Sequence, residues 1–432
     1  MTASSAWMIL ASSSSYHTSS HVSLSHRLIL PLVLGILLST SQVISLRTNL
    51  LLNGDVSPAE SPLPYWFNTD FTVTYSMIPT NDQLWDPESV RRYIRLYTPR
   101  NKRDMNRFDA IFHVESDFSV FTPKALQLFR EATFTEGKPS FCSPPFDAPY
   151  TYSWVNSFML DMCPHDLSIE KNLENIQIQD YSWSVVILTD RDLPPVLTMF
   201  KGFGLEKATG SGHIALYPKL GATVWATMKN AFDPAGRENP PFMLSWRWGK
   251  GLVWAVAQDY DRDWWGVQSG LFGWDPRKNP VSPDIVLNMI YYSVGRQLPE
   301  DITIIHEIRM VYRSLSDDRE LLLSILEFVQ RFGAATSKIE ARIDEIRSLE
   351  KEAELQFEEG MYDESLAALR EASARYGEIG NDAMKLKNQA IFWVYVIEWS
   401  VVLSSCMICG SVLYTLMIGK RLYKQAATTR AR

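Results

Sequence analysis

The segment from residue 391 to residue 418, IFWVYVIEWSVVLSSCMICGSVLYTLMI, constrains the fold of this chain more than any other stretch. It holds a single charged side chain, Glu398, and the part from Trp399 to Ile418 alone is long enough to cross ~30 Å of hydrocarbon as a helix. A buried core helix is the alternative, but such a helix is rarely apolar on every face. We therefore predict one transmembrane helix at residues 391–418.

The flanking residues predict its orientation. Trp393, Tyr395 and Trp399 stand at the start of the segment, where amphipathic rings favour the headgroup layer. All the charged side chains of the tail, residues 419–432, are basic, which is typical of the cytoplasmic side. The bulk of the chain is therefore expected outside the cytoplasm, with the lipid bilayer as a partner. A second envelope or membrane protein, bound through the helical region or the transmembrane helix, is a further expected partner.

The N-terminal region, residues 1–45, reads as a leader followed by a targeting segment. Arg27 precedes LILPLVLGILL and then STSQVIS, the order of a signal peptide: a basic residue, a short apolar run and a small polar cleavage zone. An uncleaved signal anchor is the alternative. Both place residue 46 onward on the same, exterior side of the membrane.

Residues 46–300 alternate strand and helix signals. Helices are predicted to begin at Pro87 and Pro123, each preceded by a capping residue, Asp86 and Thr122. Strands are predicted at residues 48–52, 71–75, 108–114, 139–143, 185–188 and 223–227. Alternation with short connections predicts the α/β class, a doubly wound flavodoxin-like sheet with helices on both faces.

The most specific local pattern in this region is residues 242–259, FMLSWRWGKGLVWAVAQD, which predicts a hairpin turning at Gly249 and Gly251. With the 108–114 strand, the following FTPKALQLFREA and the 137–143 strand, it resembles a class I glutamine amidotransferase-like domain. The likeness covers about residues 46–297 and is greatest to membrane-anchored members from archaea and bacteria. The C-terminal hairpin and anchor are similar to a set of archaeal membrane proteins.

The region 301–390 is predicted to be helical and to end in an antiparallel helical hairpin. Apolar residues recur at helical spacing on both sides of Gly360, and the second arm continues without a breaker into the membrane helix. At 1.5 Å per residue the arm is ~40 Å long, so the tip, with Met361 and Tyr362, is a candidate partner-docking point clear of the bilayer. The same stretch resembles one tetratricopeptide-type helix pair, but stacking of such pairs needs about three.

Charge and composition exclude some partners. The net charge is -7, and outside the cytoplasmic tail no basic patch interleaved with aromatic residues stands out. We expect no nucleic-acid partner.

The resemblance implies a test for catalysis. Active relatives carry a cysteine in a glycine-flanked turn and a downstream His-x-Glu. The counterpart by position is Cys142, but prolines and not glycines follow it, and neither His213 nor His306 has the required spacing. A disulfide with Cys163 and a free thiol both fit the sequence. We therefore expect a non-catalytic domain with a binding or assembly role at the cell envelope; the alternative is a membrane-tethered hydrolase or amidase using Cys142 or a carboxylate site.

Two groups of side chains are candidates for ligand contact. Glu115 and Asp117 follow a buried strand, at the edge where open α/β sheets bind ligands. The second group follows the hairpin: Asp259, Asp261, Asp263 and Trp264. It lacks the glycine and terminal glutamate of a calcium loop, and we expect neither a metal nor a cofactor.

Overall fold

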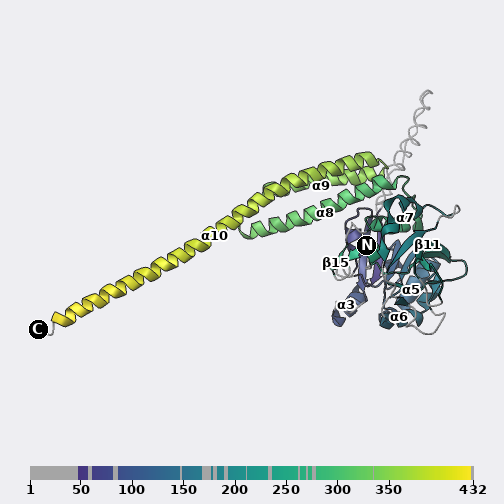
Figure 1. Cartoon of the computed structure of the whole chain (residues 1–432), viewed down its shortest axis with the longest axis horizontal. Coiled ribbons are helices and arrows are strands. Elements are labelled where there is room, and N and C mark those ends of the chain that lie inside the picture. Colours follow the sequence, from purple (N-terminus) through teal and green to yellow (C-terminus); the bar gives the residue numbers. More distant parts are fainter. Residues whose placement is uncertain are drawn as a thin grey trace, which may run out of the picture. The chain divides into compact units, whose positions relative to one another are not determined.

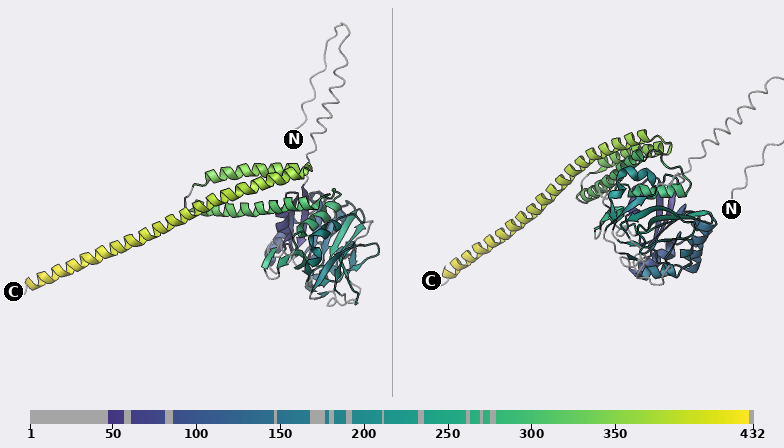
Figure 2. Two further views of the ribbon diagram at one scale, coloured as in Figure 1. Left: turned by 45° about the horizontal axis from the view of Figure 1, so that its top comes forward. Right: turned by 45° about the vertical axis from the view of Figure 1, so that its right-hand side comes forward.

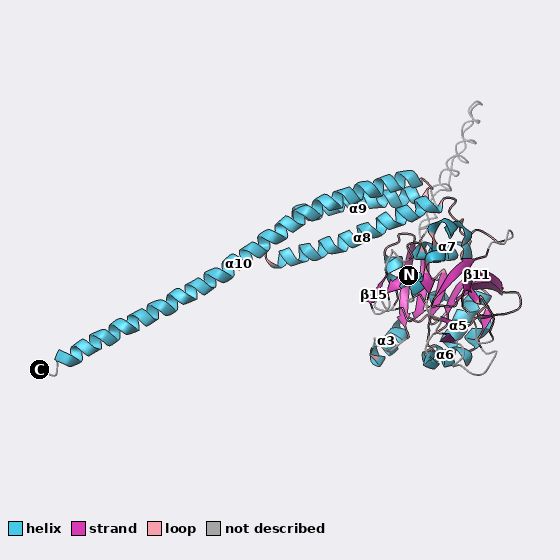
Figure 3. Cartoon of the chain, viewed as in Figure 1, coloured by secondary structure: helices cyan, strands magenta, loops and turns pink. Residues whose placement is uncertain are grey.

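The computed structural model describes residues 47–56, 61–80, 86–145, 148–167, 177–178, 182–188, 193–210, 212–231, 236–260, 263–268, 271–274, 279–333 and 335–429. The predicted leader and targeting segment, residues 1–45, lies outside these ranges, as does Asp261. Within them the chain forms a mixed α/β domain followed by three long helices (Figures 1 and 3). The predicted α/β class is confirmed.

A central sheet organises the domain. Its nine described strands lie in the order β2-β1-β3-β4-β13-β12-β11-β7-β8. Their bounds are β1 Thr48–Gly54, β2 Val73–Pro79, β3 Ala110–Val114, β4 Ser140–Ser143, β7 Trp183–Ile187, β8 Thr209–Gly210, β11 Thr223–Lys229, β12 Pro241–Trp248 and β13 Gly251–Val256. The first five strands in that order pair in parallel, and the remaining pairings are antiparallel.

Helices cover both faces of the parallel strands. Phe112 of β3 contacts Phe67 of α2 (Leu63–Asn68), with 5.7 Å between ring centroids. The next residue, His113, contacts Phe129 of α5 (Pro123–Phe134) at 5.7 Å. Because successive side chains of a strand point to opposite faces, α2 and α5 lie on opposite sides of the sheet.

The remaining elements of the domain are shorter or lie at its edges. The helices are α3 Pro87–Tyr97, α4 Lys102–Met105, α6 Ala148–Val155 and α7 Ser282–Ser293. The 3-10 turns are η1 Phe118–Val120, η2 Phe158–Met162, η4 Thr198–Phe203, η5 Leu205–Lys207 and η6 Asp263–Trp265. The short strands are β5 His165–Asp166, β6 Gln177–Ile178, β9 His213–Ile214, β10 Tyr217–Pro218, β14 Val267–Gln268 and β15 Leu271–Trp274.

Local sequence signals correctly predicted where two of the helices begin and where the hairpin turns. Asp86 caps α3, accepting hydrogen bonds from two backbone N–H groups at 3.0 Å, and Thr122 caps α5 through Ala125 N–H at 3.2 Å. Gly249 turns the β12–β13 hairpin with a φ of 62°. A Cβ there would meet the carbonyl oxygen of Phe134 at 2.4 Å, so the glycine also permits α5 to approach the turn.

The C-terminal helices are α8 (Ile302–Arg331), α9 (Ser337–Glu358) and α10 (Tyr362–Thr429). Arg342 of α9 pairs with Asp382 of α10 at 2.7 Å, which aligns the two antiparallel arms of the predicted hairpin. The first part of the predicted helical region is α8, which packs along α10 as a third helix through a shared core. Each helix buries one apolar stripe, so the region is a three-helix bundle instead of an isolated hairpin.

The α9–α10 turn at Gly360 packs on the α/β domain. Phe357 contacts Phe71, which precedes β2, with ring centroids 4.8 Å apart, and Tyr362 contacts Phe357 at 5.2 Å. Arg47, just before β1, pairs with Glu354 at 3.0 Å. The tip proposed from the sequence to dock a partner is therefore occupied in part by the protein's own domain.

Beyond Ala390, α10 has no packing partner among the described residues. Its side chains from Phe392 to Tyr423 are exposed or half-buried, and it is long and apolar enough to cross a membrane. Figure 2 shows α10 leaving the bundle where the α8–α9 turn lies beside it, in both views. The burial pattern thus changes at the residue where the apolar run begins.

Candidate functional site

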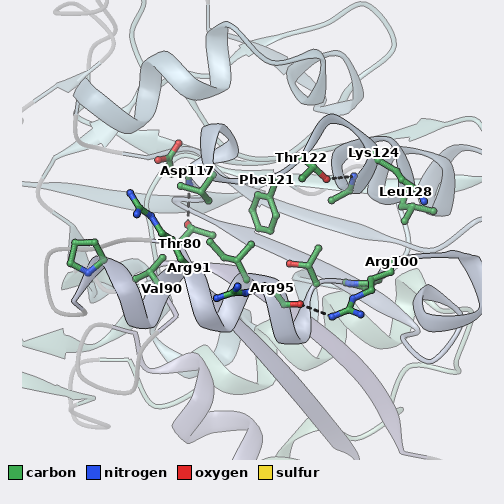
Figure 4. Close-up of a pocket in the computed structure, with 16 residues that line it drawn as sticks. Thr80, Val90, Arg91, Arg95, Arg100, Asp117, Phe121, Thr122, Lys124 and Leu128 are labelled. Carbon is green, nitrogen blue, oxygen red and sulfur yellow. Dashed lines mark hydrogen bonds between the residues drawn. The ribbon is translucent and has the colours of Figure 1, made fainter.

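A cleft lies at the edge of the sheet where β2 and β3 end. One wall is α3, and the other is formed by η1 and the first turns of α5 (Figure 4). Thr80, the residue after β2, lies between the walls. The cleft has a volume of about 1130 Å³, slightly above the usual range for small-molecule sites.

The cleft is lined by an excess of positive charge. Arg91 and Arg95 project from α3, Arg100 follows that helix, and Lys124 lies in the first turn of α5. Asp117 is the one acidic side chain among the described lining residues. Within the described residues Arg91, Arg95 and Lys124 form no ion pair. Like charges at i and i+4 of a helix repel, so Arg91 and Arg95 favour an anion between them and the opposite wall.

Asp117 is positioned by its neighbours. Its backbone N–H donates to the Thr80 hydroxyl at 3.0 Å, and its carboxylate accepts a hydrogen bond from Ser119 N–H at 2.9 Å. These bonds tie the start of η1 to the end of β2. The predicted ligand candidate Asp117 therefore does lie on the wall of a cleft, where it offers a hydrogen-bond acceptor among cations.

Glu115 lies elsewhere, on the inner side of the same edge. With Asp55 and Asp259 it lines a space too small for a water molecule, at the ends of β3, β1 and β13. Its backbone φ of 45° is unusual for a side chain larger than glycine. The structure thus brings Glu115 and Asp259 together, although the sequence placed them in separate groups, and it separates both from the cleft. In the described part of the chain no cluster of acidic, histidine or cysteine residues is arranged to hold a metal ion.

The aromatic candidate Trp264 is buried. Its ring meets Trp265 edge-on at 4.7 Å and Phe242 at 4.8 Å. This packing leaves no face for a sugar to stack on. Asp263, in η6, precedes it.

Cys142 is fully buried in β4. Its sulfur lies 3.2 Å from that of Cys163, and both thiols are free. Burial raises the pKa of the Cys142 thiol well above its usual value, and the neighbouring thiol raises it further. A nucleophilic cysteine needs the opposite, a pKa lowered by a positive neighbour.

A histidine does lie beside Cys142 in the sheet. His113 of β3 is in register with Cys142 of β4 and with Asn53 of β1. Its Nδ1 is 2.8 Å from the Asn53 side-chain oxygen, while its Nε2 has no hydrogen-bond partner among the described residues. Burial lowers the pKa of His113 to about 3, so the imidazole is neutral. Asn53, His113 and Cys142 are all packed in the core, and Cys142 makes no hydrogen bond to His113.

Sequence reasoning missed the cationic cleft. A signal was present: residues 91–103, RRYIRLYTPRNKR, are basic and interleaved with tyrosines, so the expectation of no such patch outside the tail was wrong. The opposite wall, with Lys124, comes from a different helix, so the convergence of the charges is visible only in the fold.

Comparisons with known proteins add little. No family model matches this chain, and no curated protein does. Among solved structures, the cytoplasmic protein STM1381 from Salmonella typhimurium LT2 is similar over 57% of this chain and 99% of its own, with 13% sequence identity and a TM-score of 0.42. At that similarity the two chains share too little for a role to be transferred.

Proposed function

We propose that this chain is a membrane-anchored, extracytoplasmic binding protein. Its domain is a doubly wound, flavodoxin-like relative of the glutamine amidotransferases, and it binds an anionic small ligand in the cleft between α3 and α5. Its role is binding or assembly at the cell envelope, without catalysis. The single observation that carries the proposal is a roomy cleft at the carboxyl edge of parallel strands, lined by Arg91, Arg95 and Lys124, which form no ion pair with any described residue.

The anchor is supported by α10. Its apolar run starts where the bundle ends, and the basic tail follows directly. Positive charge on that side favours a cytoplasmic tail and hence an exterior domain.

The ligand class follows from the donors. Three guanidinium groups and one ammonium group favour a phosphate or carboxylate, and arginine binds both through paired N–H groups. Asp117 and the hydroxyl of Thr122 are suited to neutral hydroxyl groups on the same ligand. A phosphorylated or carboxylated sugar or metabolite has both features.

Non-catalytic binding is supported by the state of Cys142. The thiol is buried, its pKa is raised, and Cys163 occupies the position next to it. None of these features suits a nucleophile.

The experiment compares thermal stability of the full chain in detergent with inorganic phosphate, a sugar phosphate, a tricarboxylate and the corresponding neutral sugar. A ligand at 100 times its dissociation constant stabilises the folded state by about 2.7 kcal/mol. We expect at least one anion to stabilise the protein while the neutral sugar does not. The double variant Arg91→Glu, Arg95→Glu should abolish that shift.

Arg92→Glu is the matched control. Arg92 lies on the same helix and is exposed, but it does not line the cleft. The proposal fails if no anion stabilises the protein, or if the double variant and the control respond alike.

A further inference from the structure

The turn between α8 and α9 carries two exposed aromatic side chains. Phe328 and Phe332 lie one helical turn apart at the end of α8, with ring centroids at 4.9 Å. Both are exposed, Phe332 to 49%, while Val329 beside them is buried in the bundle core. Exposed adjacent phenylalanines on a soluble surface are unfavourable unless something covers them.

The register of the bundle fixes the height of this turn along α10. Arg370 of α10 pairs with Glu307 of α8, an offset of 63 residues between two helices that run in the same direction. Because both helices rise by 1.5 Å per residue, the same offset places Phe328 level with Ile391 and Phe332 level with Tyr395.

The α9–α10 register independently places the turn within about 10 Å of that height. Arg342 pairs with Asp382, and these helices run in opposite directions. Moving back along α9 from Arg342 to Thr336 corresponds to moving forward along α10 to Asn388. The turn therefore ends within about one helical turn of the start of the apolar run.

We infer that the α8–α9 turn inserts Phe328 and Phe332 into the headgroup layer of the bilayer. The inference rests on the proposed insertion of α10, because the turn reaches the membrane only if the apolar run spans it. At that height α10 itself presents Phe392, Trp393, Tyr395 and Trp399, an arrangement typical of the membrane interface. The lipid is the occupant that the structure favours, since the register places the exposed rings of the turn level with the exposed aromatic residues of α10.

The consequence is a second point of attachment. A single helix allows the bundle to tilt about the membrane, whereas a helix and an inserted turn together restrict the tilt. From Asp363 to Ala390 the bundle is ~40 Å long at 1.5 Å per residue. Two attachments at its base would therefore hold the α/β domain at a defined distance and direction from the lipid.

The test places an environment-sensitive fluorophore on single cysteines of the full chain in liposomes. Cys406→Ala and Cys409→Ala remove the exposed thiols, and the remaining two are buried. The labelled variants are Phe332→Cys at the turn, Leu355→Cys on α9 and Val402→Cys in the apolar run. Leu355 is 53% exposed and Val402 is 50% exposed, so all three sites carry a label at similar cost to the fold.

We expect a blue-shifted emission at residue 332, quenching by lipids labelled near the headgroup, and several-fold weaker quenching by iodide than at residue 355. Lipid exposure at 402 with iodide access at 332 would overturn the inference and leave the anchor intact. Iodide access at both 332 and 402 would overturn the anchor as well. Protection of residue 332 from iodide and from lipid quenchers alike would mean that protein covers the turn, which also overturns the inference.

Discussion

Arg309 of α8 and Asp284 of α7 form a fully buried ion pair, in which Nη1 donates a hydrogen bond to Oδ1 at 2.8 Å. Nε of the same arginine lies 3.2 Å from a carboxylate oxygen of Asp70, which precedes β2. His306, one turn earlier on α8, binds the second oxygen of Asp284 at 2.7 Å. This cluster joins the domain-proximal end of the helical bundle to the α/β domain.

The first prediction concerns that joint. Arg309→Met removes the cation that is hydrogen-bonded to Asp284 and lies against Asp70, and removing one partner of a buried pair costs about 3–5 kcal/mol of unfolding free energy. Denaturant unfolding of the full chain in detergent, followed by tryptophan fluorescence, measures it. Arg331→Ala is the control, because its ion pair with Glu327 is exposed, and it should cost about 0.5 kcal/mol or less. Equal stability of the two variants would mean that the buried pair does not hold the joint.

The second prediction concerns the loss of folding stability as the pH falls. Burial lowers the pKa of His113 to about 3, whereas the unfolded chain protonates a histidine near pH 6.5. The unfolded state therefore binds the proton first as the pH falls, and below about pH 6.5 the stability declines by about 1.4 kcal/mol per pH unit from this residue. His165 is buried in the same way and adds its own decline.

The comparison of His113→Gln with the natural chain isolates the first histidine. The slope of unfolding free energy against pH between 6 and 4.5 should fall by about 1.4 kcal/mol per unit in the variant. An unchanged slope would show that His113 is not held neutral in the fold.

The third prediction concerns the thiols. In the folded chain a maleimide should leave Cys142 and Cys163 unmodified, because both are fully buried and burial raises the pKa of the Cys142 thiol. After denaturation all four cysteines should react, because the two buried thiols are free. Mass spectrometry of peptides with and without denaturant measures this. Rapid modification of Cys142 in the folded chain would restore the hydrolase alternative.

The fourth prediction separates two roles of glycine. Gly249→Ala must both adopt a φ of 62° and place a Cβ against the Phe134 carbonyl, whereas Gly221→Ala, with a φ of 89°, meets no atom within 4 Å. The conformation alone costs about 1–2 kcal/mol of stability. Gly249→Ala should cost clearly more than Gly221→Ala in the same unfolding assay. Equal costs would mean that α5 moves away from the hairpin freely.

The features that the sequence predicted well are local ones. The caps at Asp86 and Thr122, the glycine turn of the β12–β13 hairpin and the apolar run of α10 each depend on residues within a few positions of one another. Such signals act before any tertiary contact forms, so they can be recognised without the fold.

The features that were missed depend on distant residues. The cleft combines Arg91 of α3 with Lys124 of α5, and the pairing of β1 with β3 that brings these helices together has no local signal. For the same reason α8 was not expected as a third bundle helix, since its packing along α10 joins segments over 60 residues apart. Among the residues predicted to contact a ligand, Asp117 lies on a cleft wall in the structure, whereas Trp264 is buried in the core.

The proposed topology, an exterior domain held by a C-terminal span, is tested by labelling with a membrane-impermeant maleimide in intact cells. Leu220→Cys places a thiol on a fully exposed position of the α/β domain, and Gln425→Cys places one in the basic tail, with Cys406 and Cys409 replaced by alanine. We expect labelling at residue 220 in intact cells and at residue 425 only after lysis. Labelling at residue 425 in intact cells, with residue 220 protected until lysis, would contradict it and place the domain in the cytosol.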